Sequence, residues 1–275
     1  MAEGEEKRQR GRPRSVYASH DQAGVQSLDR AVSLLGLVAE GNGLSLTELA
    51  NRSGLAPSTV YRMLTTLQRH GVAEFEEPSQ LWFVGVELFR MGSAFLRRRK
   101  LAERGRAVIE ELMLETGETA NLAIADHRTV VFVTQAESHE TIRAFFRPGT
   151  RSPCHASGIG KAILAFSTAE RCEALLGRGK LESFTTKTLT TREALDADLQ
   201  QVRLRGYALD DEERNIGMRC IAAPVFNELG EPFGGVSISG PSVRIDQAFI
   251  DRVAPMVVAA GYRLTEAVGG AHVTG

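Results

Sequence analysis

The feature that most constrains the fold is a segment bounded by a proline and a glycine. Residues 57–70 can form a helix, because proline is tolerated at the first helical position, whose N–H has no partner within the helix. Gly71 can end that helix in a left-handed conformation. The apolar residues follow the i, i+3, i+4, i+7 spacing of one buried face, namely Val60, Met63, Leu64 and Leu67. The segment therefore predicts a short helix with a single apolar side.

The opposite side of this predicted helix combines hydroxyl groups with arginines. On a helical wheel it carries Ser58, Arg62, Thr65 and Arg69, flanked by Thr59, Tyr61 and Thr66. Residues 51–70 contain no acidic residue. A helix of this kind can enter the major groove of DNA and contact base edges there. Taken alone, the pattern fits an ordinary amphipathic helix with a solvated polar face better.

The flanking segments favour the DNA-binding interpretation. Ser45 and Glu48 match a capping box that opens a short helix ending at residue 53, and Gly54-Leu55-Ala56 can link two helices tightly. Two strands that could form a wing are predicted at 72–76 and 81–84. A helix is predicted at 27–40, with an apolar side made of Leu28, Ala31, Val32, Leu35 and Val38. Together these elements predict a winged helix-turn-helix domain over residues 25–85.

Length and composition indicate a globular chain of about two domains, given its 275 residues. Hydrophobic residues at 43% and charged residues at 24% are typical of such domains. No apolar run approaches the ~18 residues of a membrane helix, and the N-terminus is charged, unlike a secretory signal. Three scattered cysteines fit neither a disulfide framework nor a common metal pattern. We expect a cytoplasmic protein without metal or cofactor.

The net charge of the whole chain is −1, so positive charge that could bind DNA has to be concentrated in local clusters. Neutralisation of phosphates supplies much of the affinity of a nucleic-acid-binding protein, so local clusters of basic residues matter more than the net charge of the chain. Residues 1–24 are polar and are expected to be disordered. Within them Arg10-Gly11-Arg12-Pro13-Arg14 could place Arg12 and Arg14 in a DNA minor groove. The alternative is a tail that only aids solubility.

The second half of the chain reads as a different kind of domain. A linker helix is predicted at 86–100 and another helix at 101–116. Further strands are predicted at 119–125, 129–135, 142–146, 207–210, 220–226 and 232–239. Further helices are predicted at 156–166 and 169–176. A capping box at Thr190 and Glu193 predicts a helix that ends at residue 205, and a cap at Asp246 predicts a last helix that ends at about residue 267. These elements predict an antiparallel-rich sheet flanked by helices over residues 101–268, and an α+β chain overall.

Four polar clusters interrupt the predicted buried elements of this second domain. The glycine-rich turn at 153–162 leads into a helix, and such a turn favours a small anion, although small residues also serve close packing. The acidic run at 210–213 is usually a solvated loop, and a lone strand cysteine such as Cys220 is usually a small core residue. Ser237 and Ser239 share one strand face, and buried hydroxyls need partners. The set suits a small anionic ligand and suits catalysis poorly, because no histidine is evidently placed to activate Cys220.

Nearly the whole chain, residues 25–267, resembles the IclR family of bacterial transcriptional regulators. The motifs that carry the resemblance are 26–31 (QSLDRA), 55–64, 155–162 (HASGIGKA), 206–213, 217–224 (GMRCIAAP) and 237–241 (SISGP). The resemblance implies a winged helix-turn-helix domain, a linker helix and a GAF-like effector-binding domain. It also implies a double-stranded DNA operator as partner, and a homodimer or a dimer of dimers.

Within that family the chain looks most similar to the glyoxylate-responsive branch of allantoin-utilisation and acetate-operon repressors. This likeness implies binding of glyoxylate or pyruvate by the main-chain N–H groups of Gly158 and Ile159 and by Asp210, Cys220, Ser237 and Ser239, with Met218 as an apolar wall. Two features depart from the branch or family pattern: Ile159 replaces a common alanine, and the Arg10–Arg14 segment is not general. Pyruvate, glycolate or an aromatic acid remain alternative effectors. A small aldehyde-acid enzyme that uses Cys220 or Asp210 is the competing class.

Overall fold

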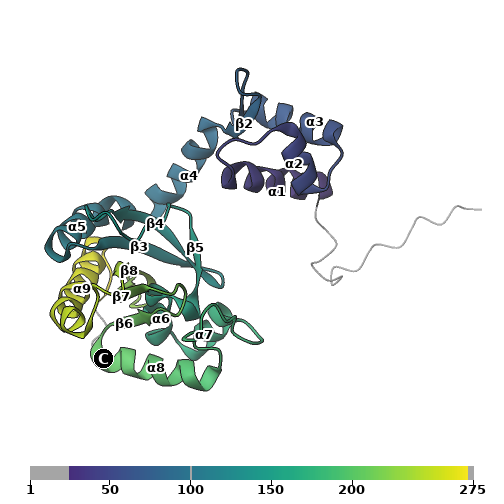
Figure 1. Cartoon of the computed structure of the whole chain (residues 1–275). Helices are drawn as coiled ribbons and strands as arrows, with labels where there is room; N and C mark the ends of the chain where they lie inside the picture. Colours follow the sequence, from purple (N-terminus) through teal and green to yellow (C-terminus); the bar gives the residue numbers. More distant parts are fainter. Residues whose placement is uncertain (1–24, 100, 272–275) are drawn as a thin grey trace, which may run out of the picture. The chain divides into compact units, whose positions relative to one another are not determined.

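The computed structural model describes residues 25–99 and 101–271, and the chain divides into two compact units, Met1–Ser93 and Ala94–Gly275 (Figure 1). The first unit contains three helices followed by a two-stranded antiparallel hairpin. They are α1 (Gln26–Glu40), α2 (Leu46–Ser53), α3 (Pro57–Arg69), β1 (Ala73–Glu76) and β2 (Leu81–Val84). Helix α4 (Val86–Arg99) follows. This order is the predicted winged helix-turn-helix.

Local signals set the ends of the helices in the first unit. Ser45 Oγ accepts a hydrogen bond from the Glu48 N–H at 3.3 Å, and Glu48 Oε2 accepts from the Ser45 N–H at 2.9 Å. Gly54 and Gly71 both have a φ of +66°, a conformation that side chains rarely adopt. The predicted capping box and both glycine positions are therefore confirmed, as is the helix that begins at Pro57.

The apolar side predicted for the first helix is wrong in part. Val38 is buried, but Leu28 and Val32 are 61% and 60% exposed. Leu34, which the helical wheel did not single out, is fully buried. The core of this unit gathers Leu34, Val38, Leu49, Val60, Leu64 and Trp82 around the contacts of α1 with α2 and β2. Because α1 extends beyond those partners, only part of its apolar surface is covered.

The second unit is a six-stranded antiparallel sheet with helices on both faces. Its strands are β3 (Thr119–Asp126), β4 (Thr129–Ala136), β5 (Arg151–Pro153), β6 (Ala208–Asp211), β7 (Met218–Phe226) and β8 (Pro232–Pro241), in the order β5-β4-β3-β8-β7-β6. Its helices are α5 (Leu101–Thr116), α6 (Gly158–Ala165), α7 (Ala169–Leu176), α8 (Arg192–Arg205) and α9 (Gln247–Ala267). One hydrophobic cluster joins α5 and α9 to one face, and another joins α6 and α8 to the other (Figure 1).

One strand predicted for this sheet does not form. The segment 142–146 is irregular, and the short strand β5 pairs with β4 instead. Side chains bind the main chain of the irregular segment: Thr119 Oγ1 donates to Ala144 O at 3.0 Å, and the Phe146 N–H donates to Gln135 Oε1 at 2.9 Å. These bonds replace the ladder that a strand would need.

Two helix starts also differ from their predictions. The helix expected from residue 156 is divided into a 3-10 turn, Cys154–Ala156, and α6, because Ser157 adopts an extended conformation and caps α6. Helix α8 is capped by Thr191 rather than Thr190, through a bond from the Ala194 N–H to Thr191 Oγ1 at 3.2 Å. The cap at Asp246 is confirmed. Among the described residues, no helix has the length and apolar character needed to cross a membrane.

Candidate functional site

The start of α6 presents two main-chain N–H groups that the helix itself does not use. Ser157 Oγ accepts from the Gly160 N–H at 3.0 Å, and the Ser157 carbonyl accepts from the Lys161 N–H at 2.9 Å. The N–H groups of Gly158 and Ile159 precede these and have no acceptor within the helix. They lie at the positive end of the helix dipole, where a negative group is stabilised.

The strand register brings three of the expected residues into one row. Asp210 on β6 is opposite Cys220 on β7, and Cys220 is opposite Ser239 on β8. Ser237 lies two residues earlier on β8 and therefore shares the face of Ser239. Helix α6 packs on β7 and β8. The row of polar side chains thus lies beneath the start of α6, where the Gly158 and Ile159 N–H groups have no acceptor within the helix.

A small cavity of about 30 Å³ lies between this row and the start of α6. All seven residues that the sequence suggested for an effector line it, namely Gly158, Ile159, Asp210, Met218, Cys220, Ser237 and Ser239. Gly158 is required for the close approach of helix and strand, because an added Cβ would lie 2.9 Å from Cys220 Sγ. The geometry therefore joins segments that are up to about eighty positions apart in the sequence.

One hydroxyl group in the cavity wall is left without a partner. Ser237 is fully buried, and among the described residues its Oγ makes no hydrogen bond. Ser239 Oγ accepts from Asn121 Nδ2 at 3.3 Å, and Asn121 Oδ1 is also buried without a partner. Buried polar atoms are normally hydrogen-bonded, so these two are exceptions that call for a ligand or an ordered water.

Cys220 is a neutral thiol in this setting. Burial and, to a smaller extent, the nearby Asp210 raise the pKa of the Cys220 thiol to about 11, against the opposing influence of Ser239, Ser237 and the Gly158 N–H. The thiolate, rather than the thiol, is the nucleophilic form of cysteine. Cys220 can therefore contact a ligand by weak polar and dispersion forces, but it is poorly suited to attack one.

Asp210 belongs to a buried cluster of charges at one end of the cavity. Burial raises the pKa of the Asp210 carboxyl to about 6 and that of Glu213 to about 7. The Glu213 N–H donates to Asp210 Oδ1 at 2.8 Å. Lys161 Nζ lies 2.5 Å from Glu213 Oε1 and 2.9 Å from Asp198 Oδ2. Burial alone would lower the pKa of Lys161, but the two carboxylates hold it above its usual range.

The cavity also has lining residues that sequence reasoning missed. Phe132 and Phe146 stack at 4.5 Å between ring centroids and form an apolar wall. Arg214 lines the same cavity, and its guanidinium carbon lies 3.8 Å above the centre of the Phe184 ring. No periodic or motif signal marked these three residues. Phe132 lies on β4, whereas Phe146 comes from the irregular segment 137–149 and Arg214 from the loop after β6, so only the tertiary fold brings the three together.

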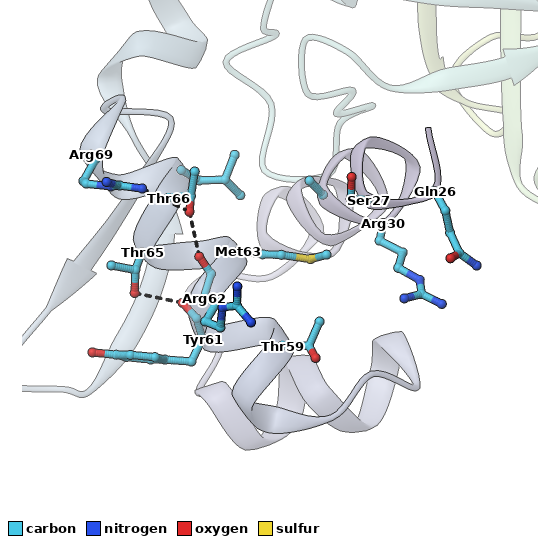
Figure 2. Close-up of a pocket in the computed structure, with 12 residues that line it drawn as sticks. Gln26, Ser27, Arg30, Thr59, Tyr61, Arg62, Met63, Thr65, Thr66 and Arg69 are labelled. Carbon is cyan, nitrogen blue, oxygen red and sulfur yellow. Dashed lines mark hydrogen bonds between the residues drawn. The ribbon is translucent and has the colours of Figure 1, made fainter. Parts of the chain in front are cut away.

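The polar side of α3 faces outward as predicted. Ser58, Tyr61, Arg62 and Arg69 are exposed, and Thr59 and Thr65 are half-buried. Thr65 Oγ1 donates to the Tyr61 carbonyl at 2.8 Å, which leaves its oxygen free to accept. A groove of about 730 Å³ runs beside this surface between α1 and α3 (Figure 2). Arg12 and Arg14 lie outside the described residues.

Comparisons with known proteins agree with this two-part organisation. The family described as IclR helix-turn-helix domain matches residues 27–77, and bacterial transcriptional regulator IclR C-terminal matches residues 93–265. The chain belongs to the IclR family. The transcriptional regulator BhcR of Paracoccus denitrificans is 51% identical over 94% of each chain. The transcriptional repressor IclR of Escherichia coli is 40% identical over 95% of this chain and 96% of its own. The crystal structure of Thermotoga maritima IclR superposes with a TM-score of 0.75 at 26% identity, covering 89% of this chain and 99% of that one.

Membership of the IclR family decides between the classes that the sequence left open. The matching families and relatives are transcriptional regulators rather than enzymes. The protein is therefore a DNA-binding transcriptional regulator with an effector domain, and its winged helix-turn-helix is the DNA-binding part.

Proposed function

We propose that the second unit binds a small 2-oxo acid, glyoxylate first, and that this ligand controls DNA binding by the winged helix-turn-helix. The observation that carries the proposal is the fully buried Ser237 hydroxyl, which has no partner among the described residues and lines a cavity that Gly158 and Ile159 at the start of α6 also line. A buried hydroxyl of this kind costs free energy unless a ligand or water binds it.

The polar groups of the cavity suit the two ends of such a ligand. Its carboxylate would accept from the N–H groups of Gly158 and Ile159 and from the hydroxyls of Ser237 and Ser239. Cys220 and Asp210 would contact the aldehyde or its hydrate. A cavity of about 30 Å³ is small for a ligand site, which favours a small acid over an aromatic one. Pyruvate and glycolate are the alternatives of similar size.

The variant Ser239→Ala tests the proposed pose. Losing one hydrogen bond to a charged ligand typically costs about 1.5–3 kcal/mol, so the glyoxylate affinity should fall about ten- to a hundredfold in titration calorimetry. Ser183→Ala is the matched control, because the Ser183 hydroxyl is exposed and donates to the Thr185 carbonyl. Equal glyoxylate affinity for wild type and Ser239→Ala would overturn the assignment. Titration of pyruvate and glycolate ranks the alternatives.

We also propose that the polar side of α3 reads the operator. Arg62 contacts a base edge and Ser58 a phosphate, while Thr59, Tyr61, Thr65 and Arg69 complete the surface; Arg12 and Arg14 of the tail enter the minor groove. The exposure of Arg62 and the lack of acidic residues on α3 support this pose. Arg62→Ala should cost ~1–3 kcal/mol at one base position.

Gel shifts test this pose on the DNA upstream of the protein's own gene, with and without glyoxylate. Wild type should discriminate between the four bases at the position that Arg62 contacts, and Arg62→Ala should bind duplexes that differ at this one position with similar affinity. If Arg62→Ala instead binds every variant as the wild type does, α3 has been placed wrongly. A chain that begins at Val16 should show a shallower salt dependence, because it lacks the tail arginines.

We further propose a homodimer, or a dimer of dimers, because part of the first unit exposes apolar side chains. Val25, Leu28 and Val32 of the α1 region are each at least 60% exposed, and Val86 at the start of α4 is 73% exposed. Contiguous exposed apolar surface usually marks an interface. Light scattering on Leu28→Ser with Val32→Ser should report a smaller mass than wild type. An unchanged mass would show that α1 is not at the interface.

A further inference from the structure

The groove between α1 and α3 carries an unusual concentration of positive charge. Among the described residues that line it, three are arginines and none is acidic. Arg30 comes from α1, whereas Arg62 and Arg69 come from α3 (Figure 2). Gln26 and Ser27 add an amide and a hydroxyl from the first turn of α1. None of these α1 residues belongs to the α3 surface proposed to read the operator.

The arginines of this groove lack the carboxylate partners that many others in the molecule have. Arg90, for example, pairs with Glu87 at 2.6 Å, and Arg151 pairs with Asp126 at 2.6 Å. In the described part of the chain, Arg30, Arg62 and Arg69 form no ion pair, and Arg69 contacts only the Thr66 hydroxyl, at 3.5 Å. Three like charges without a counter-charge repel each other, so the groove favours an anionic partner.

Figure 2 shows that Arg30 and Arg62 leave different helices and flank Met63 and Thr59. Arg62 lies on the α3 surface proposed to face the base edges, so Arg30 is displaced from that surface by the width of the groove. A DNA strand whose major groove holds α3 has its phosphates at the border of that groove, and those phosphates need donors beside the recognition helix.

We propose that the α1–α3 groove binds the phosphodiester backbone that borders the major groove, with Arg30 as a phosphate-contacting residue of α1. This inference rests on the proposed docking of α3. The net charge of −1 supports it, because a chain with 33 basic and 34 acidic residues must concentrate positive charge locally to bind DNA. Guanidinium, amide and hydroxyl donors without base-specific geometry are the groups that usually contact phosphate.

A phosphate contact and a base contact leave different signatures. A phosphate contact weakens binding to all sequences alike, and its loss makes the slope of log affinity against log salt shallower by about 0.9. A base contact changes the ranking of operator variants at one position. Arg30 and Arg62 should therefore be separable by two measurements on the same variants.

The test measures DNA binding by fluorescence anisotropy between about 50 and about 200 mM KCl. The probes are a mixed-sequence duplex and the bound site from the upstream region, with its single-base variants. Arg30→Ala should lower the affinity for all of these duplexes by a similar factor and make the slope shallower by about 0.9. Arg30→Lys should restore the slope, because a lysine keeps the charge. Arg90→Ala is the matched control and should change neither quantity, since Arg90 is already paired with Glu87.

Two results would overturn the inference: an unchanged salt slope in Arg30→Ala, or a loss of affinity confined to one base position. Arg30 is exposed, so its removal leaves the core of the unit intact, and the thermal unfolding of each variant checks this. Arg30→Gln provides a second neutral variant with a longer side chain. A failure of the α3 pose gives a different result: Arg62→Ala would then keep the wild-type order of affinities for the single-base variants. The salt slope of Arg30→Ala is measured independently of that order.

Discussion

The groove of the first unit and the cavity of the second are both suited to anions, but by opposite means. The groove is large, about 730 Å³, and it is lined by exposed arginines that no carboxylate neutralises within the described residues. The cavity is about 30 Å³, and hydroxyls, a thiol and the start of α6 line it together with the Asp210 carboxyl and the Arg214 guanidinium. Beside the cavity, the fully buried Lys161 is paired with Glu213 and Asp198.

The difference shows how each region can combine affinity with selectivity. Exposed charges attract any polyanion, and mobile ions screen them. Buried polar groups attract a distant ligand only weakly. Each of them must form a hydrogen bond with a ligand atom, because a buried polar atom without a partner costs free energy. The groove can therefore supply affinity for DNA of any sequence, whereas the cavity can distinguish one small acid from another.

The largest expected effect comes from breaking the buried charge cluster beside the cavity. Lys161→Met leaves two carboxyl groups without their cation, and this should lower the free energy of unfolding by about 3–5 kcal/mol. Urea denaturation measures it. Lys187→Met is the matched control, because Lys187 is 44% exposed and its pairs with Asp211 and Glu212 are at the surface, where such pairs contribute about 0–1 kcal/mol. Similar losses in the two variants would show that burial does not distinguish these pairs.

The next largest effect should be the different salt dependence of DNA binding by the groove and of glyoxylate binding by the cavity. If Arg30 and Arg69 each neutralise one phosphate, they contribute a slope of about −1.8, so raising KCl fourfold should lower the DNA affinity by at least about twelvefold. The glyoxylate affinity should change less than about twofold over the same range, because buried interactions are weakly screened. Anisotropy and calorimetry on one preparation give both values. A steep salt dependence of glyoxylate binding would mean that charges accessible to mobile ions, such as the half-buried Arg214, dominate binding in the cavity.

The pH dependence of effector binding should give a smaller effect. An anionic ligand beside Asp210 favours the protonated carboxyl, so the bound state takes up a proton. Because the pKa of Asp210 in the free protein is about 6, the affinity should fall as the pH rises above about 6, by at most about tenfold per unit. Lys161, Glu213, Arg214 and Cys220 face or adjoin this carboxyl and modulate the midpoint.

Calorimetry from pH 5.5 to 8 measures this linkage, and the profile of Asp210→Asn should be flatter than that of wild type, because an amide does not titrate in this range. DNA binding without effector should keep its pH dependence in the variant. An affinity for glyoxylate that rises with pH would have the wrong sign and would show that the bound anion does not favour the protonated form of Asp210.

Sequence reasoning succeeded in the first unit where the signals are short-range. The capping box of Ser45 and Glu48 spans three residues, and Pro57 and Gly71 act at the ends of their own helix. Sequence reasoning failed in part for α1, whose apolar surface is wide. The packing of α2 and β2 decides which part of that surface is covered, and it buries Leu34 rather than Leu28. In the second unit sequence reasoning missed the edge strand β5, whose three residues carry almost no periodicity.

The sequence by itself indicated which residues could matter at the cavity, since Ser237 and Ser239 share one face of an apolar strand and the family resemblance implied Asp210 and Cys220. Only the tertiary structure decided that they share one cavity, because the register of β6, β7 and β8 aligns them. It alone revealed Asn121 behind Ser239 and Arg30 beside α3, which no local pattern marks. Helix caps and turns arise from hydrogen bonds between near neighbours in the chain, whereas sites arise where distant segments pack together, and that packing is set by the whole core.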